Sequence, residues 1–201
     1  MRRSRTAPVA ADSRSGDKQA NMDPRLVIDF WFSTDSQRRW FRSTPEFDER
    51  IRACFLPLWE EAKARRLDHW METPEGALAL VIVLDQFPLN IFRGEAEGFS
   101  TEALAREVAD HAIQQRWDAD MDDSRKSFFY LPFMHSEALA DQHRSVQLYQ
   151  SAKLADGLRW AEHHRQIIRR FGRFPHRNAP LGRVNTPEET AWLASNEAFR
   201  G

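Results

Sequence analysis

Three Thr-Pro-Glu triplets, which begin at Thr44, Thr73 and Thr186, constrain the fold of this chain more than any other sequence feature. Each triplet is typical of a helix start, because the threonine hydroxyl can accept a hydrogen bond from a free backbone N–H. Proline at the next position lacks the N–H that the helix would leave unpaired, and glutamate favours the positive end of the helix dipole. The spacing of the first two triplets indicates stacked helical hairpins, although no sequence repeat recurs cleanly.

Hydrophobic periodicity extends these starts into helices along the chain. The pattern predicts helices over 24–32, 46–66, 75–86, 101–116, 136–152, 156–171 and 187–195. Residues 78–84 are apolar on all sides, which predicts a buried helix at the centre of the molecule, since no other segment offers a convincing strand partner. We therefore expect an all-α fold with a single compact core.

The charges of the chain are almost balanced, with 29 basic and 30 acidic residues. This balance argues against bulk electrostatic binding to nucleic acid, which needs a basic face. No apolar run approaches the ~20 residues that a membrane span requires, and none resembles the apolar region of a signal peptide. We therefore expect a cytoplasmic protein with neither nucleic acid nor membrane as a partner. The single cysteine, Cys54, lies on an apolar-periodic stretch and is expected in the core.

The N-terminal segment has the composition of a disordered tail. Residues 1–22 are rich in serine and arginine and contain two aspartates, with no apolar stretch that could join a core. Ordered-looking sequence begins directly after Met22, which could be the true start. We expect a tail over residues 1–22 and a single all-helical domain over 23–201.

Three polar motifs lie where predicted helices end or begin. They are Leu-Asp-Gln-Phe-Pro-Leu-Asn-Ile-Phe-Arg-Gly over 84–94, Tyr-Leu-Pro-Phe-Met-His-Ser-Glu over 130–137, and Phe-Gly-Arg-Phe-Pro-His-Arg-Asn over 171–178 with Leu-Gly-Arg over 181–183. The first follows the buried helix directly, so the carboxylate of Asp85 needs a partner. In the second, Ser136 can cap the next helix, with His135 just before that helix and Glu137 in its first turn.

The chemistry of these motifs is complementary and indicates a site for a small anionic molecule. Arginine offers a planar donor fork that suits carboxylate or phosphate, and histidine can move protons near neutral pH. The candidates for acid–base catalysis are His135, Glu137, His176 and Asp85. The candidates for ligand binding are Gln86, Asn90, Arg93, His164, Arg173, Arg177, Asn178 and Arg183. Whether the chain is an enzyme stays open at this point.

A structural interpretation of the same residues carries equal weight. Proline ends helices, asparagine caps or turns, and arginine can neutralise Asp85 and Glu137 within a buried network. The alternative function is then a protein-interaction module that holds a protein partner in a helical groove. Accessible, convergent Arg and His side chains would favour the small-molecule site, whereas fully paired and buried ones would favour the interaction module.

Other chemistries lack their sequence signatures. The chain contains neither the His-Glu-x-x-His nor the Glu-x-x-His pattern of metal sites. It also lacks the Gly-x-Ser-x-Gly motif of serine hydrolases, and its glycines form no nucleotide-binding loop. We therefore expect neither metal nor cofactor. The seven tryptophans are dispersed, which favours packing over a stacking platform. Of the pair His163 and His164, one is expected to face the core and the other solvent.

The three motifs and several further segments together match the pattern of a known family. The further segments are Phe-Trp-Phe over 30–32, Trp-Phe over 40–41, Phe-Asp over 47–48, and His164 ahead of the third motif. With them the chain, from about Pro24 to Leu193, resembles a bacterial family labelled domain of unknown function 924. The resemblance implies stacked antiparallel helical hairpins, similar to tetratricopeptide-repeat proteins, and no established activity. Leu89 stands where relatives usually carry arginine, which implies one fewer positive contact to an anion, and Val-Asn over 184–185 replaces a usual Ser/Thr-Thr pair.

Overall fold

The computed structural model describes residues 22–195 and 198, and within that part of the chain the fold is all-α, as predicted, with no strand. Its α-helices are α2 (Pro24–Trp31), α3 (Thr34–Gln37), α4 (Pro45–Lys63), α5 (Pro74–Val81), α6 (Phe87–Ile91), α7 (Glu102–Gln114), α8 (Asp123–Met134), α9 (Leu139–Ser151), α10 (Ala155–Phe171) and α11 (Pro187–Leu193). Short 3-10 helices are η1 (Asp68–Glu72), η3 (Ala96–Phe99) and η4 (Pro175–Arg177), and η2 (Ile82–Gln86) is a π-helix. The predicted tail lies outside the described residues except for Met22.

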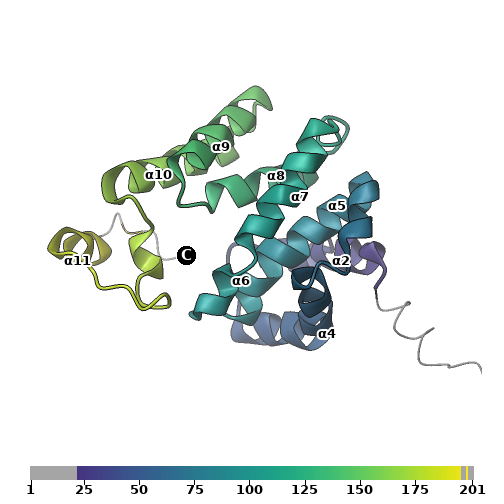
Figure 1. Cartoon of the computed structure of the whole chain (residues 1–201), viewed down its shortest axis with the longest axis horizontal. Helices are drawn as coiled ribbons and strands as arrows, with labels where there is room; N and C mark the ends of the chain where they lie inside the picture. Colours follow the sequence, from purple (N-terminus) through teal and green to yellow (C-terminus); the bar gives the residue numbers. More distant parts are fainter. Residues whose placement is uncertain (1–21, 196–197, 199–201) are drawn as a thin grey trace, which may run out of the picture.

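Helices that follow one another in the sequence pack side by side over the second half of the fold. Helix α7 contacts α8, α8 contacts α9, and α9 contacts α10. Figure 1 shows α2, α4 and α5 gathered at one end of the molecule and α9 to α11 toward the other end. Tetratricopeptide-like stacking of these hairpins stays a prediction.

All three Thr-Pro-Glu triplets start helices, as predicted. The hydroxyl of Thr44 accepts the N–H of Phe47 at 3.3 Å and so caps α4. Thr73 caps α5 in the same way. Thr186 forms a full capping box with Glu189, whose carboxylate accepts the N–H of Thr186 at 2.7 Å. The local chemistry of capping therefore fixes these three boundaries.

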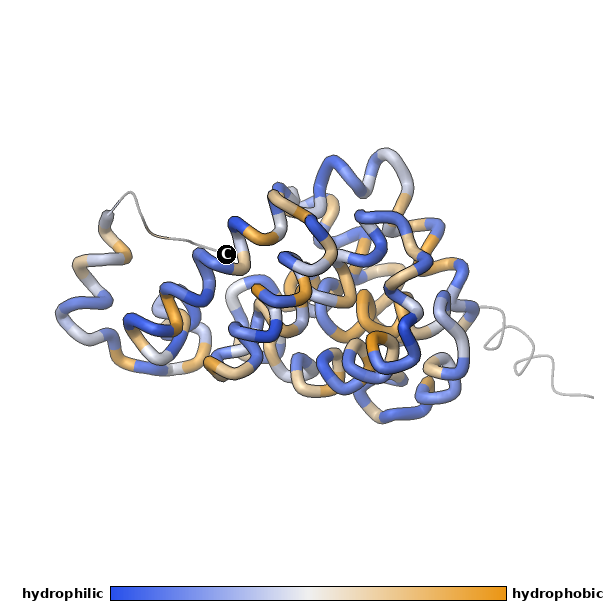
Figure 2. Tube along the Cα trace, turned by 90° about the horizontal axis from the view of Figure 1, so that it is seen from above, coloured by the Kyte–Doolittle hydropathy of each residue, from blue (hydrophilic) through white to orange (hydrophobic). Residues whose placement is uncertain are grey.

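The core forms around α5, whose residues from Gly76 to Val81 are all buried. The apolar face of α4 packs against this centre through Phe47, Ile51, Phe55, Leu58, Trp59 and Ala62. A second, smaller apolar cluster joins α10, η4 and α11 through Ile167, Ile168, Phe174 and Trp192. Figure 2 shows that hydrophobic residues concentrate inside the larger part of the molecule. No helix of the described part is long and apolar enough to span a bilayer.

The expectation for Cys54 is wrong. Cys54 is exposed on α4, not in the core, because it lies on the solvent side of the helix between the buried Ile51 and Phe55. Trp160 is 45% exposed on α10, whereas other tryptophans such as Trp31 and Trp59 are buried. The pair on α10 divides as predicted, with His164 buried and His163 nearer the surface.

Helix α8 was not expected, because Pro132 lies inside it and proline removes a helix hydrogen bond. Asp122 caps the helix by accepting the N–H of Arg125 at 3.0 Å. The prediction that Ser136 caps the following helix is also wrong. Helix α9 begins at Leu139 after Ala138, so Glu137 lies before its first turn. Ser136 instead accepts the N–H of Ala138 at 3.1 Å and donates to Asp141 at 2.6 Å.

Candidate functional site

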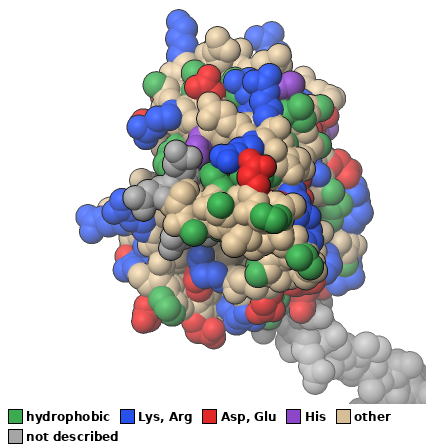
Figure 3. Space-filling model, turned by 90° about the vertical axis from the view of Figure 1, so that its left-hand side faces the viewer, with side chains coloured by type: hydrophobic (Ala, Val, Ile, Leu, Met, Phe, Trp, Pro, Cys, Tyr) green, Lys and Arg blue, Asp and Glu red, His purple; other side chains and the backbone are tan. Residues whose placement is uncertain are grey.

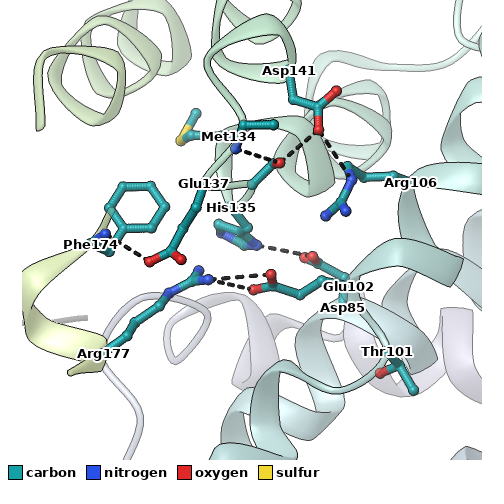
Figure 4. Close-up of polar contacts among 12 residues, drawn as sticks. Asp85, Thr101, Glu102, Arg106, Met134, His135, Glu137, Asp141, Phe174 and Arg177 are labelled. Carbon is teal, nitrogen blue, oxygen red and sulfur yellow. Dashed lines mark hydrogen bonds and ion pairs between the residues drawn. The ribbon is translucent and has the colours of Figure 1, made fainter. Parts of the chain in front are cut away.

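A buried Asp85–His135 pair stands at the centre of the candidate site. His135 Nδ1 lies 3.0 Å from Asp85 Oδ1. Because an ionised carboxylate can only accept, the nitrogen must donate this hydrogen bond. Gln86 Nε2 donates to the second oxygen, Asp85 Oδ2, at 2.6 Å. The two hydrogen bonds offset the cost of keeping a carboxylate out of water. Figure 4 shows His135 and Asp85 pointing toward one another between the helices.

The π-helical turn η2 is what positions Asp85. It continues α5 directly, so the apolar helix predicted over 75–86 becomes wider in its last five residues. Such turns expose backbone groups that a regular helix would pair, and they are frequent at functional sites. Here the hydroxyl of Thr101 donates to the carbonyl of Leu84 at 2.6 Å and accepts the indole N–H of Trp59 at 3.2 Å. The turn is therefore anchored to the start of α7.

His135 is the residue that ends α8, where its own N–H bonds to the Leu131 carbonyl. Burial alone would lower the pKa of His135, but the charge and hydrogen bond of Asp85, helped by Glu102, outweigh it and raise that pKa. The ring is 16% exposed, so it is not sealed inside the core. Nε2 has no hydrogen-bond partner among the described side chains and backbone.

Glu102 and Arg177 complete the group around this pair. Arg177 Nη1 lies 3.0 Å and 3.2 Å from the two oxygens of Glu102. The guanidinium is buried between two aromatic rings, with its carbon 4.5 Å from the centre of Phe99 and 4.7 Å from that of Phe174. The pKa of the Glu102 carboxyl is raised, chiefly by burial, although Arg177 and His135 act against this shift. Two carboxylates, one histidine and one arginine thus meet at one place.

The other two arginines of the third motif hold the C-terminal segment in place. Arg183 donates to both oxygens of Glu137, at 2.8 and 2.9 Å, and to the Phe174 carbonyl. Arg173 donates to both oxygens of Glu189, at 2.7 and 2.8 Å. Burial would raise the pKa of Glu137, but Arg183 and the Phe174 N–H lower it. Glu137, a catalytic candidate from the sequence, is thus committed to this contact.

Asn90 and Arg93 of the first motif take part in a different cluster. Asn90 Nδ2 donates to Asp48 Oδ1 at 2.7 Å, and Arg93 Nε donates to Asp48 Oδ2 at 2.7 Å. Asp48 belongs to α4, so this cluster joins α4 to α6. Asn178, by contrast, lies in the C-terminal segment, where it donates to the side chain of Asn185 at 2.7 Å.

His164 and His176 are both held neutral by their surroundings. Burial lowers the pKa of His164 to about 3, and its Nδ1 donates to the Trp160 carbonyl at 2.8 Å. Burial, followed by the charge of Arg177, lowers the pKa of His176 to about 4. Of the three histidines proposed from the sequence, only His135 has a pKa shifted toward the charged form.

No group of three or more His, Cys, Asp or Glu side chains within the described ranges is arranged to hold a metal ion. Figure 3 shows the face of the molecule near the C-terminal helices, where basic, acidic and hydrophobic side chains are interspersed. The electrostatic character of the site therefore comes from individual pairs and not from a broad patch of one sign.

A family model described as a bacterial protein of unknown function matches residues 27–197. The chain belongs to the domain of unknown function 924 family. It is similar to a solved structure of a protein of unknown function from Agrobacterium tumefaciens, with 42% sequence identity and a TM-score of 0.81 over 85% of this chain and 96% of that chain. No curated protein matches it.

Glu102 was not among the site residues predicted from the sequence of this member of the 924 family, although it pairs with Arg177. An acidic residue in the first turn of a helix is ordinary, because it favours the helix dipole, so nothing in the local pattern marks Glu102 as part of a site. Its partner Arg177 is 75 positions away in the sequence. The one available signal was indirect: buried Asp85 and a motif rich in arginine required further carboxylates nearby to balance the charge.

Proposed function

We propose that this member of the 924 family binds a small polar metabolite of anionic character beside His135, and that His135 transfers a proton to or from it. The observation that carries the proposal is the 3.0 Å contact between His135 Nδ1 and the buried Asp85 carboxylate. A histidine oriented by a carboxylate on one nitrogen, with the other nitrogen uncommitted, is the arrangement that acid–base catalysis uses.

The contact with Asp85 leaves Nε2 as the nitrogen that is available to exchange a proton. The carboxylate keeps a proton on Nδ1, so neutral His135 carries its lone pair on Nε2 and can accept a proton there. Protonated His135 can donate from the same atom. Because Asp85 raises the pKa of His135, the charged form persists to higher pH than for an ordinary histidine. A histidine in this setting can act as an acid when it is protonated and as a base when it is neutral.

The neighbouring charges define what kind of ligand is favoured. Asp85 and Glu102 contribute two carboxylates against the single guanidinium of Arg177, and protonated His135 makes the group neutral. A cationic group would be attracted by the two carboxylates but repelled by Arg177 and the imidazolium beside them. An anionic group that contacts His135 and Arg177 together would be stabilised by both.

A protein-interaction module remains the second candidate, and one observation favours it. Each motif arginine contacts a carboxylate of the chain: Arg93 with Asp48, Arg173 with Glu189, Arg177 with Glu102, and Arg183 with Glu137. Paired side chains are what a structural network requires, and all of these except the exposed Arg93 are at least partly buried. In this case the motifs stabilise the fold, and the binding surface for a protein partner lies elsewhere on the helices.

A thermal-shift screen against anionic metabolites separates the two candidates. The wild type is compared with His135→Gln and with His69→Gln, which changes an exposed histidine on η1. A ligand present at 100 times its dissociation constant adds about 2.7 kcal/mol of stability. The proposal expects this gain in the wild type and in the His69 variant and its loss in the His135 variant.

The opposite results would support the interaction module. These are equal stabilisation of the His135 variant, or the absence of any hit while motif variants are simply less stable. A proton NMR titration gives an independent check on the pair itself. Asp85→Asn keeps the shape of the side chain but removes its charge, so the pKa of His135 should fall relative to that of the wild type.

A further inference from the structure

Arg177 uses its guanidinium differently from the other arginines of the third motif. Arg173 and Arg183 each hold a carboxylate through two nitrogens, which is the preferred geometry for this pair of groups. Arg177 reaches Glu102 through Nη1 alone, which lies close to both oxygens. The Glu102 carboxylate therefore occupies only one corner of the fork.

The Arg177 nitrogens that do not contact Glu102 lack an acceptor within the part of the chain that the structure describes, and one of them is buried. Arg177 is 5% exposed, and its Nε is buried without a hydrogen-bond partner among the described residues. Nη2 also donates to no described group, but unlike Nε it is not fully buried. The rings of Phe99 and Phe174 cover the two faces of the guanidinium, so water does not reach it from those sides. A buried donor without an acceptor destabilises a protein, so an acceptor at this edge would stabilise the guanidinium.

Glu102 is itself poorly placed as a permanent partner. Helix α7 packs against α5, η1, η2 and α8, and η4 approaches its start. Of the charged groups on these elements, Arg177, His135 and Asp85 act on the Glu102 carboxyl, and the Asp85 charge opposes its ionisation. Burial raises the pKa of Glu102 further. Its hold on Arg177 therefore weakens whenever it takes up a proton.

We infer that Glu102 is a placeholder for a ligand carboxylate, which displaces it from Nη1 and binds the Arg177 guanidinium through two nitrogens, as Glu189 and Glu137 bind Arg173 and Arg183, while reaching toward His135. This inference rests on the proposed function and specifies it, because it names a carboxylate as the anionic group and Arg177 as its receptor. Displaced Glu102 is left beside Asp85 and becomes protonated. Binding of the carboxylate therefore takes up a proton and strengthens as pH falls.

Acetate is the probe that tests this exchange, because it carries the same carboxylate group as the Glu102 side chain but is free in solution. The full chain, labelled with ¹⁵N in arginine, is titrated with acetate while the Nε–H resonance of Arg177 is followed, with chloride at equal ionic strength as the control. Arg177→Lys identifies the resonance by its disappearance. Glu102→Gln removes the charge of the placeholder and keeps its shape, so we expect its dissociation constant for acetate to be about tenfold lower than that of the wild type, equivalent to ~1.4 kcal/mol.

A matched variant controls for a general change in charge. Glu107→Gln alters the same helix at an exposed position, where the carboxylate pairs with Arg65. Its affinity for acetate at Arg177 should equal that of the wild type. The pH dependence gives the second readout: wild-type affinity increases from pH about 8 to about 5, and the Glu102 variant shows a weaker dependence, from His135 alone. Circular dichroism and the melting temperature establish that each variant is folded.

Acetate that binds the Glu102 variant no more tightly than the wild type, or that leaves the Arg177 Nε–H resonance unmoved in both, overturns the placeholder. If the Glu102 variant does not fold, the wild-type titration across the same pH range decides: affinity independent of pH overturns the inference. These experiments distinguish failure of the placeholder from failure of the proposed function. Loss of ligand stabilisation in His135→Gln with no acetate effect at Arg177 would keep the acid–base site and remove the placeholder alone.

Discussion

Glu137 holds Arg183 through two charge-assisted hydrogen bonds, 2.8 Å from Nη1 to Oε2 and 2.9 Å from Nη2 to Oε1. The same carboxylate accepts the N–H of Phe174 at 2.8 Å. One side chain between α8 and α9 thus fixes both a side chain and the backbone of the C-terminal segment. We expect Glu137→Gln to lower the free energy of unfolding by about 1–3 kcal/mol, because hydrogen bonds to charged groups are lost.

Urea unfolding measures this effect, with Glu162→Gln as the control, since Glu162 is an exposed residue of α10. The control should unfold at the same urea concentration as the wild type. Equal midpoints for the two variants would mean that the Glu137 contacts contribute nothing to stability.

Thr101 is predicted to be the most sensitive hydroxyl of the fold. Thr101→Val keeps the shape of this fully buried side chain but leaves the Leu84 carbonyl and the Trp59 indole N–H without their partner. Each unpaired buried group costs about 1–3 kcal/mol. Thermal unfolding should show the loss, while Thr190→Val, at an exposed position of α11, should change stability by less than ~0.5 kcal/mol. A stable Thr101 variant would show that the π-helical turn does not depend on this anchor.

Gly157 is predicted to be a position where any larger residue destabilises the protein. A Cβ at this position would lie 2.3 Å from Cε1 of Tyr149, a ring that is buried and bonded through its hydroxyl to the Ser127 carbonyl. Gly157→Ala should therefore destabilise the protein by about 1–3 kcal/mol through overpacking, despite the ~1 kcal/mol that alanine gains in helix propensity.

A double-mutant cycle isolates the steric cause. In a Tyr149→Leu background the ring is gone, so Gly157→Ala should cost less than in the wild type. An identical cost in both backgrounds would place the effect in the backbone of α10 and not in the ring.

Acid should loosen the C-terminal helix through Glu189. The hydrogen bond from Arg173 lowers the pKa of this carboxyl to about 2, against a burial effect of opposite sign. A depressed pKa means that the stability it contributes is complete above its ordinary value of ~4.3 and is lost as pH falls toward the folded-state value.

The measurement is the stability of the wild type and Glu189→Gln as a function of pH. The difference between them should shrink between pH about 4 and about 2. Glu188→Gln changes the exposed neighbour, which pairs with Arg170, and serves as the control. A difference that stays constant over this pH range would show that the charge of Glu189 is not what stabilises α11.

The parts of the fold that could be predicted from the sequence are those fixed by short-range chemistry. Thr44, Thr73 and Thr186 start helices because each hydroxyl meets an N–H only three residues away. The buried face of α4 follows from apolar residues at helical spacing. Helix α8 was not predicted because proline at position 132 argues against a helix. Asp122, a helix-capping residue, and the mostly apolar residues over 128–134 were signals in its favour.

The site was predictable in its residue types but not in its pairings. The buried end of an apolar helix predicted that Asp85 needs a partner, and His135 is that partner. Which carboxylate each arginine contacts depends on tertiary packing over long sequence separations, as for Arg177 and Glu102. Because the sequence contains almost as many basic as acidic residues, composition alone cannot assign these pairs.

The wide turn of η2 also makes the site sensitive to the number of residues that precede it, and not only to their identity. A π-helical turn holds one more residue than a regular one, so removing a single residue between Ile82 and Leu84 would restore ordinary winding. The wide turn would be lost, and with it the local backbone geometry that carries Asp85 and the Leu84 carbonyl. Asp85 would still be an aspartate in a helix, yet no longer on the turn that positions its carboxylate beside His135. In the 924 family, gaps and insertions at this turn should therefore be a more sensitive indicator of a lost site than substitutions are.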